Sequence, residues 1–279
     1  MTDPTVPNRP RLVMHSLNGL KEEGGVNQDA FNGRICDAGI IVAAVADGVG
    51  SLPDSHEFSQ AAVAAVVESA TELSEILSGD ATPEHAPAAP TIETGHSIGP
   101  TDSLSVEIHA VIRRNLATRL DQICDKSGAT TLLYAVITRD TVMWGRVGDG
   151  AVVLSCYEKE KLVIREMANK IYTSTDVLEY PDVDGSAWSI GQRELSTVEY
   201  MMLATDGITD ATENKEEFFR YVHGRLAGLD QAEAEATLAS ILAGFPEAHI
   251  DDKTLAYIDL ATHTDPESPN SDPSESVQE

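Results

Sequence analysis

The sequence predicts an α+β protein, a four-layer α-β-β-α sandwich in which two antiparallel sheets lie between pairs of helices. Short apolar runs that end in Asp-Gly are typical of buried strands. Two pairs of segments with apolar residues every three or four positions indicate amphipathic helices. The resulting order of strands, two helices, strands, two helices and a final strand favours this sandwich, although periodicity alone also allows other layered α+β folds.

The first half of the chain contains a predicted hairpin and two predicted helices. Residues 31–46 read as two strands joined by a turn near residues 36–39. Residues 57–77 carry apolar side chains at three- and four-residue spacing, with glutamates between them, which predicts one amphipathic helix. Residues 104–125 repeat this pattern. We expect the two helices to pair across the sheet.

The second half of the chain contains more strands and a second pair of helices. The second half begins with a predicted β meander, because apolar segments follow one another there with tight turn signals between them. The weakest pattern lies in residues 164–192, which include a loop at residues 180–185. The predicted elements are strands at residues 130–138, 141–147 and 151–156, helices at residues 215–226 and 231–242, and a last strand at residues 254–260.

Composition separates one predicted domain, residues 11–261, from the segments around and within it. A chain of 279 residues with 42% hydrophobic content can bury one sizeable core. Residues 78–103 contain four Pro, three Gly and no Lys or Arg, which predicts a disordered insert. We expect residues 1–10 to be flexible and residues 262–279 to form a disordered acidic tail.

Net charge and apolar content exclude several classes of protein. The formal net charge of −27 argues against binding to nucleic acid or to anionic membrane surfaces, because phosphates would be repelled. The longest apolar stretch, residues 38–46, is about half of the roughly 20 residues that a membrane helix needs. The three cysteines have no metal-type spacing, and the first residues lack a secretory signal. We therefore expect a cytoplasmic protein with reduced thiols.

The two Asp-Gly motifs predict a site for a cation. Asp47-Gly48 follows the apolar run 41–46, and Asp206-Gly207 follows the apolar run 201–204. A carboxylate at the end of a buried strand is costly unless it is paired, so it favours a bound cation. Two such carboxylates far apart in the sequence indicate one shared metal site.

Further aspartates stand beside predicted strands and strengthen this hypothesis. Asp29 precedes the first hairpin, Asp149 lies between two glycines after a strand, and the adjacent pair Asp251-Asp252 precedes the last strand. Oxygen ligands are preferred by Mg²⁺ and Mn²⁺. An Asp before Gly is also a common turn residue, which is the alternative for each position.

The order and spacing of these motifs resemble the metal-dependent protein phosphatases of the 2C class. The landmarks are Gln28-Asp29-Ala30, Asp47-Gly48-Val49-Gly50, Ser127-Gly128-Ala129-Thr130, Gly148-Asp149-Gly150, Asp206-Gly207 and Asp251-Asp252 followed by Thr254. Several ordered landmarks are jointly more specific than any one of them. The resemblance covers most of the chain and implies an α-β-β-α catalytic domain with a mobile flap between the third and fourth aspartate landmarks.

The resemblance also implies a role for each aspartate. Asp47 matches the carboxylate that bridges two Mg²⁺ or Mn²⁺ ions, with the Gly48 carbonyl as a neighbouring ligand, and a water between the ions attacks phosphorus in line. Asp206 and Asp251 match carboxylates that hold one of the ions. Asp29 corresponds to a member of the same cluster that acts through metal-bound water, and Asp149 to a residue that holds a third, weaker ion. Asp252 is the alternative to Asp251.

Three positions depart from the family pattern. The arginine that commonly grips the substrate phosphate is replaced by Gly24, and animal members have Glu and His where this chain has Gln28 and Val49. His15 is a candidate to bind phosphate or donate a proton, although an isolated His is more often structural. Other candidates to replace the missing arginine are Lys21, Arg34 and Arg146.

Three functions follow from these patterns. The first is a Mg²⁺- or Mn²⁺-dependent monomeric phosphatase that removes phosphate from serine or threonine in proteins and opposes a bacterial Ser/Thr kinase. The second is a regulatory protein that keeps the fold and binds phosphorylated partners with little or no turnover, because the gripping arginine is absent. The third is a phosphohydrolase of small molecules that uses the same metals. Ser127–Thr131 is expected to shape the floor of the site in each case.

Overall fold

The computed structural model describes residues 10–19, 25–36, 39–78, 103–158, 161–166, 177–178, 183, 188–245 and 250–260. The strands are β1 Arg11–Leu17, β2 Ala30–Ile35, β3 Ile41–Ala46, β4 Leu132–Ile137, β5 Thr141–Val147, β6 Ala151–Glu158, β7 Lys161–Glu166, β8 Ser189–Glu194, β9 Val198–Ala204 and β10 Lys253–Asp259. The helices are α1 Ser55–Glu68, α2 Ala70–Ser78, α3 Ser103–Asp121, α4 Asp206–Thr209, α5 Lys215–Leu226 and α6 Gln231–Ala243, with a short 3-10 turn at Leu195–Thr197.

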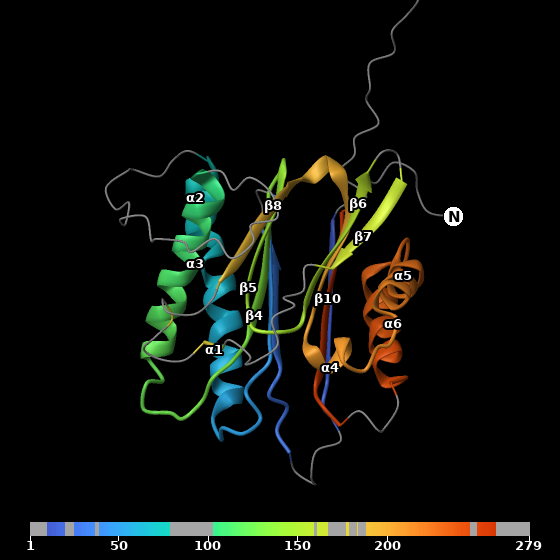
Figure 1. Cartoon of the computed structure of the whole chain (residues 1–279). Coiled ribbons are helices and arrows are strands. Elements are labelled where there is room, and N and C mark those ends of the chain that lie inside the picture. The colour runs from blue at the N-terminus through green and yellow to red at the C-terminus, as the bar shows by residue number, and fades with distance from the viewer. Residues whose placement is uncertain are drawn as a thin grey trace, which may run out of the picture.

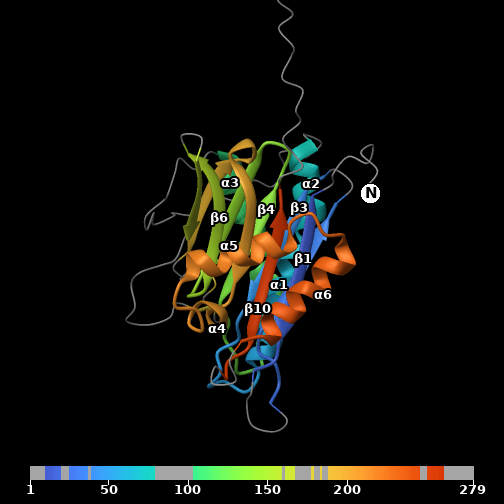
Figure 2. The same cartoon turned by 90° about the vertical axis from the view of Figure 1, so that its right-hand side faces the viewer.

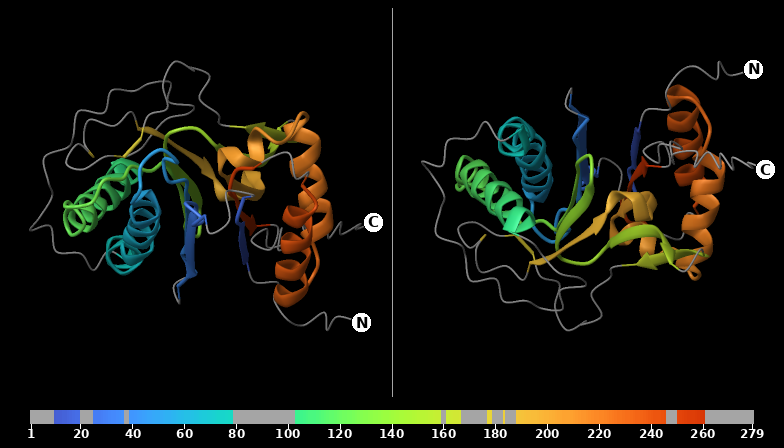
Figure 3. Two further views of the ribbon diagram at one scale, coloured as in Figure 1. Left: turned by 90° about the horizontal axis from the view of Figure 1, so that it is seen from below. Right: turned by 90° about the horizontal axis from the view of Figure 1, so that it is seen from above.

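These elements form four layers (Figures 1 and 3). One five-stranded sheet has the order β2-β3-β4-β5-β8 and is covered by α1, α2 and α3. The other has the order β1-β10-β9-β6-β7 and is covered by α5 and α6, as Figure 2 shows from the side of those helices. All neighbouring strands run antiparallel. The predicted α-β-β-α sandwich of two antiparallel sheets is confirmed.

Each interface between layers has its own apolar core. In β3 all six residues are buried: Val42, Ala44 and Ala46 face the helices, whereas the alternate residues lie between the two sheets. A strand covered on both faces reads as a continuous apolar run, which explains the pattern that the sequence shows there. The third core lies between the second sheet and α5 and α6.

The N-terminal strand β1 is an element that the sequence did not reveal. It pairs only with β10 among the described strands and forms one edge of its sheet. Val13 is fully buried, but the other six residues of β1 are only partly buried. An edge strand of this kind mixes polar and apolar residues, so it lacks the apolar run by which the central strands were recognised.

The single helix predicted at residues 57–77 was wrong in its detail, because the structure divides it into α1 and α2 at Ser69. The Ser69 hydroxyl donates a hydrogen bond of 2.8 Å to the Ala65 carbonyl, and Ser69 is buried. A serine that bonds the carbonyl of the preceding turn often bends a helix. The apolar spacing continues through the bend, so periodicity did not detect it.

The predicted β meander was also wrong in its third strand. β4 and β5 pair as expected, but β6 crosses to the other sheet and pairs with β7 and β9. The crossing occurs at Gly148 and Gly150, whose φ angles are +95° and +73° and therefore favour glycine. A Cβ atom at Gly150 would lie 2.6 Å from the carbonyl oxygen of Ala204, so the crossing chain packs directly on β9.

Other boundaries agree with the sequence to within a few residues. The hairpin β2-β3, helices α5 and α6, and strand β10 occur where they were predicted. Ser78 and Ser103, the expected limits of the insert, are the last residue of α2 and the first of α3, and the residues between them lie outside the described part. The predicted tail, residues 1–9 and most of the flap also lie outside it. Among the described residues, no helix is long and apolar enough to cross a membrane.

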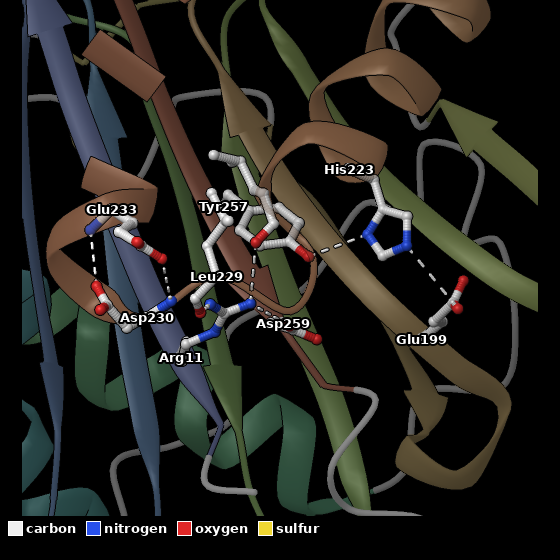
Figure 4. A network of polar contacts seen from close by, with 9 residues as sticks. Arg11, Glu199, His223, Leu229, Asp230, Glu233, Tyr257 and Asp259 are labelled. Carbon is white, nitrogen blue, oxygen red and sulfur yellow. Dashed lines mark hydrogen bonds and ion pairs between the residues drawn. The ribbon is translucent and has the colours of Figure 1, made fainter. Parts of the chain in front are cut away.

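A polar network joins the outer face of the second sheet to α5 and the turn that follows it (Figure 4). Arg11 forms an ion pair of 2.5 Å with Asp259 and donates to the carbonyls of Leu226 and Leu229. His223 Nδ1 lies 3.0 Å from the hydroxyl oxygen of Tyr257. The cation of Arg11 therefore balances a carboxylate that is only 8% exposed.

Candidate metal site

The structure brings the aspartates of the two Asp-Gly motifs to the same end of the sandwich. Asp47 follows the last residue of β3, and Asp206 opens α4 just after β9. Asp29 immediately precedes β2, whose first residue is paired with the last residue of β3. Asp251 lies just before β10, whose residue Leu255 is paired with Ala204 at the end of β9. Four chain segments from both sheets therefore meet at the edge where α4 lies (Figure 1).

The backbone of Asp47 is fixed by the Ser127–Thr131 segment. Its N–H donates to the Thr131 hydroxyl at 3.0 Å, and its carbonyl accepts from the Thr131 N–H at 2.8 Å and the Thr130 hydroxyl at 2.9 Å. Gly48 donates its N–H to the Gln28 carbonyl at 3.1 Å, and a Cβ there would meet the Ser55 carbonyl oxygen at 2.7 Å. Thr130 and Thr131 thus fix the backbone of the first Asp-Gly motif.

Asp29 is connected to the second Asp-Gly motif through a threonine. The Thr205 hydroxyl donates to Asp29 Oδ2 at 2.8 Å, and Thr205 itself directly precedes Asp206. Thr205 is 1% exposed and Asp29 is 6% exposed. Among the described residues, Asp29 Oδ1 and Asp206 Oδ1 are buried and have no hydrogen-bond partner. Buried carboxylate oxygens without partners are the atoms that a bound cation would satisfy.

Burial and mutual repulsion perturb the whole cluster. The pKa of Asp47 is raised to about 10, first by burial and then by the charges of Asp29 and Asp206. Burial is also the main cause that raises the pKa of Asp206 to about 7, followed by the charges of Asp149 and Asp251. The pKa of Asp29 is raised to about 6 by burial, against hydrogen bonds that lower it. At neutral pH these pKa values keep a proton on Asp47 and on part of the Asp206 population, and a bound cation would replace those protons.

The adjacent aspartates 251 and 252 have different surroundings. Asp251 is exposed, and its charge contributes to the raised pKa values of Asp47 and Asp206. Asp252 is 1% exposed and accepts hydrogen bonds from the backbone N–H groups of Gly19 and Gln28, each at 2.7 Å. The geometry therefore places Asp251 beside the cluster and gives Asp252 a separate set of partners.

The remaining candidates occupy less direct positions. Asp149 is half-buried in the crossing between the sheets, and its charge reaches Asp206. Arg146 is buried in β5, and Arg34 is exposed on the edge strand β2. His15 shares a face of β1 with Val13, which packs in the outer core, so it alternates away from Ser16 beside Asp29. Lys21 and Gly24 lie outside the described residues.

The donor atoms of the site suit divalent cations, but the side chains do not form a complete coordination sphere. The donors are carboxylate oxygens, the type that Mg²⁺ and Mn²⁺ prefer, and two of them are buried without a partner. Within the described ranges, however, no group of three or more His, Cys, Asp and Glu side chains is arranged so that it could hold a metal ion. The cluster thus supplies the ligand types, and its side chains are not arranged as a complete ligand set.

A pocket of about 370 Å³ opens beside Asp29 at the edge of β2. Its polar lining includes Ser16, Asn27, Asn32 and Gln60, and Phe31 stands at its side with 41% of its surface exposed. Asn27 donates to the Ser16 hydroxyl at 2.8 Å and accepts the N–H of Asp29 at 2.9 Å. Sequence patterns did not single out this pocket, nor the role of Thr205, although a Thr directly before Asp-Gly is a visible signal.

The chain belongs to the protein phosphatase 2C family, whose model matches residues 20–243. No curated protein matches the sequence. Solved structures with the same fold include a bacterial serine phosphatase, with 13% identity, coverage of 89% of this chain and 97% of that one, and a TM-score of 0.56.

Two further structures have the fold. The serine/threonine phosphatase Stp1 from Staphylococcus aureus is 12% identical, with coverage of 93% and 99% and a TM-score of 0.55. The catalytic domain of the serine threonine protein phosphatase PstP, solved in complex with two manganese ions, is 16% identical, with coverage of 90% and 97% and a TM-score of 0.54. The family resemblance that the sequence predicted is confirmed.

Proposed function

We propose that the protein is a Mg²⁺- or Mn²⁺-dependent phosphatase that removes phosphate from phosphoserine and phosphothreonine in proteins. The observation that carries this proposal is the gathering of Asp29, Asp47 and Asp206 at one end of the sandwich, where burial and, after it, neighbouring carboxylates raise their pKa values. Such a cluster is unfavourable without a counter-charge, and membership of the phosphatase family supports divalent cations in this role.

The ligands proposed for two ions are the carboxylates of Asp47, Asp206 and Asp251 and the carbonyl of Gly48, with Asp29 acting through water and Asp149 available to a third ion. Divalent ions in such a site supply a lowered pKa for water and neutralise the charge of a phosphoryl group. The chain's own contribution is orientation: Thr130 and Thr131 fix the backbone of Asp47, and Thr205 holds one oxygen of Asp29. The proposed substrates are phosphoproteins of a Ser/Thr kinase.

A second candidate function is a phosphatase-fold protein that binds phosphorylated partners without efficient turnover. Two observations favour it: the phosphate-gripping position is Gly24, and the described residues contain no group of three or more potential ligands arranged to hold a metal ion. Under this alternative, the fold and a phosphopeptide surface are retained, while the metal site is incomplete.

The test is hydrolysis of p-nitrophenyl phosphate and of a phosphothreonine peptide by the purified full-length protein, with Mn²⁺, with Mg²⁺ or with EDTA. We expect metal-dependent turnover that is lost in Asp206→Ala and kept in Asp140→Ala, which changes an exposed carboxylate in the turn between β4 and β5. Phosphopeptide binding without turnover under any metal would favour the second candidate. Turnover of free phosphate esters of metabolites but not of the peptide would move the substrate class to small molecules.

A further inference from the structure

Both side-chain oxygens of Asp252 accept hydrogen bonds from backbone groups, whereas Asp29 Oδ1 and Asp206 Oδ1 have no hydrogen-bond partner among the described residues. The Gly19 N–H donates to Oδ1 and the Gln28 N–H donates to Oδ2, each at 2.7 Å, and the side chain is almost fully buried. Hydrogen bonds from N–H groups to a carboxylate are shorter and stronger than those between neutral groups. These two contacts are therefore among the firmest polar contacts near the site.

The two donors bracket the segment that connects β1 with β2. Gly19 lies two residues after the end of β1, and Gln28 lies directly before Asp29. A single carboxylate thus binds both Gly19 and Gln28, and the Asn18 side chain donates to the Gly25 carbonyl at 3.2 Å. Because Gln28 adjoins Asp29, the position of Asp29 depends on the bond from Gln28 to Asp252.

Two glycines hold the backbone around Asp252 from both sides. A Cβ atom at Gly19 would lie 2.0 Å from the Ile250 carbonyl oxygen, and one at Gly207 would lie 1.9 Å from the Asp252 carbonyl oxygen. Neither position has room for a side chain, so the segment 250–252 is in direct backbone contact with both neighbours. Gly207 belongs to the second Asp-Gly motif, and the packing therefore connects Asp206 to the same point.

We propose that Asp252 is a positioning residue, not a metal ligand, and that its carboxylate holds the backbone of Gly19 and Gln28, and through Gln28 the adjoining Asp29, in place beside the 250–252 segment. The inference rests on the proposed function for its consequence in catalysis. The structural part of the inference is independent of catalysis: the carboxylate of Asp252 keeps its hydrogen bonds to Gly19 and Gln28 whether or not a metal is bound. The neighbouring Asp251 is the member of the pair that would hold a metal ion.

The test compares Asp252→Asn with Asp251→Asn in the full-length, metal-free protein by amide hydrogen exchange. In Asp252→Asn one backbone N–H faces an NH₂ group in place of an oxygen, so exchange at Gly19 or Gln28 is expected to quicken by about tenfold or more. In Asp251→Asn the same amides keep their exchange rates. Equal rates at both amides in Asp252→Asn and the unchanged protein would overturn the proposal.

If Asp252→Asn does not fold, amide exchange in the unchanged protein still tests the proposal. The amides of Gly19 and Gln28 must then be protected as strongly as those of β10, and exchange at the rate of an unstructured peptide would overturn the proposal. Calorimetry with Mn²⁺ gives a second readout: Asp251→Asn is expected to weaken binding by more than about tenfold, and Asp252→Asn to keep the stoichiometry. Loss of an ion only in Asp252→Asn would reverse the two assignments. The exchange data decide the role of Asp252, whereas the hydrolysis assay decides the proposed function.

Discussion

Buried carboxylates lie near both ends of strand β10, but their surroundings differ. At its C-terminal end Asp259 forms an ion pair of 2.5 Å with Arg11, in a network that also contains His223 and Tyr257 (Figure 4). At the other end, beyond Lys253, burial and then the charges of neighbouring carboxylates raise the pKa values of Asp47 and Asp206. At the first end the cation of Arg11 pairs directly with a carboxylate. At the other end the Lys253 ammonium donates to the backbone carbonyl of Asp251 at 2.7 Å. The buried Oδ1 atoms of Asp29 and Asp206 there have no hydrogen-bond partner among the described residues.

This difference separates a structural role from a binding role. A carboxylate balanced by an arginine of the same chain is satisfied as soon as the protein folds, so it contributes to stability and has no need of a ligand. Carboxylates gathered against one another make the metal-free fold less stable and favour divalent cations. Changes at the Arg11 end should therefore affect stability, and changes at the Asp47 end should affect activity and metal binding.

The largest effect is expected for Asp47→Ala. Because Asp47 is proposed as a ligand of the ions, its loss should lower kcat by at least about a thousandfold. The metal-free protein should stay folded, because Asp47→Ala removes a buried acidic group whose ionised form is unfavourable there. The measurement is kcat with Mn²⁺ beside a thermal melt of the metal-free protein. Full activity in this variant would contradict the proposal that Asp47 is a metal ligand.

The next largest effect is the dependence of stability on pH and metal. The aspartates of the cluster ionise near pH 3.8 in the unfolded chain, but Asp206 keeps its proton to about pH 7 in the fold. The folded state therefore binds more protons, and the metal-free protein loses stability as pH rises from about 4 to 7, by on the order of 4 kcal/mol for Asp206 alone.

Thermal melts in EDTA and in Mn²⁺ across this pH range measure that loss. We expect the melting temperature in EDTA to fall with pH and the stabilisation by Mn²⁺ to grow, because the metal replaces the protons. A melting temperature in EDTA that rises from about pH 5 to pH 7, with no effect of Mn²⁺, would contradict the account of the cluster.

A smaller and purely structural effect is expected for Arg11→Met. Without the guanidinium the carboxylate of Asp259, 8% exposed, loses its ion pair, and we expect a cost of about 3 kcal/mol in the free energy of unfolding. The matched control is Arg114→Met, whose ion pair with Glu72 is exposed and should contribute less than about 1 kcal/mol. Urea unfolding measures the loss of stability in each variant. A lower kcat per folded molecule in Arg11→Met would contradict the claim that this end of β10 has only a structural role.

The smallest effect is expected for His223→Phe. The imidazole stacks on Tyr200 with ring centroids 4.1 Å apart, and a phenyl ring can keep that contact, but the buried hydroxyl of Tyr257 loses its partner at 3.0 Å. We expect a cost of about 1 kcal/mol and no change in Mn²⁺ affinity. Chemical denaturation and calorimetry check the two parts, and weakened Mn²⁺ binding would show that the ends are coupled.

Sequence patterns predicted the elements whose environments are simple. Residues 41–46 are apolar on both faces because β3 lies between a helix layer and a second sheet, and the helices α5 and α6 show one apolar face because only one face is covered. Edge strand β1 was not predicted, because a strand that is partly exposed lacks such a pattern. The sheet to which β6 belongs is set by the positive φ angles of Gly148 and Gly150, which a pattern of apolar residues does not record.

The candidate site was predictable in part for the same reason. Asp47 and Asp206 were singled out because each ends a recognisable strand, and Asp29, Asp149 and Asp251 because they stand beside predicted strands. The family resemblance then implied a role for each of them. The different surroundings of Asp251 and Asp252 depend on backbone N–H groups of Gly19 and Gln28, far away in the sequence. The link from Thr205 to Asp29 likewise joins residues that only the packed sheets bring together. Long-range hydrogen bonds of this kind leave little trace in composition or spacing.

The most direct test of the cation account is a calorimetric titration of the metal-free, full-length protein with Mn²⁺ at about pH 7, beside Asp206→Ala and the control Asp140→Ala. We expect the unchanged protein and Asp140→Ala to bind Mn²⁺ with proton release, because the cluster gives up the protons that its raised pKa values retain, and Asp206→Ala to lose an ion. Absence of Mn²⁺ binding by the unchanged protein, or identical binding by Asp206→Ala, would contradict the proposal that these carboxylates hold divalent cations.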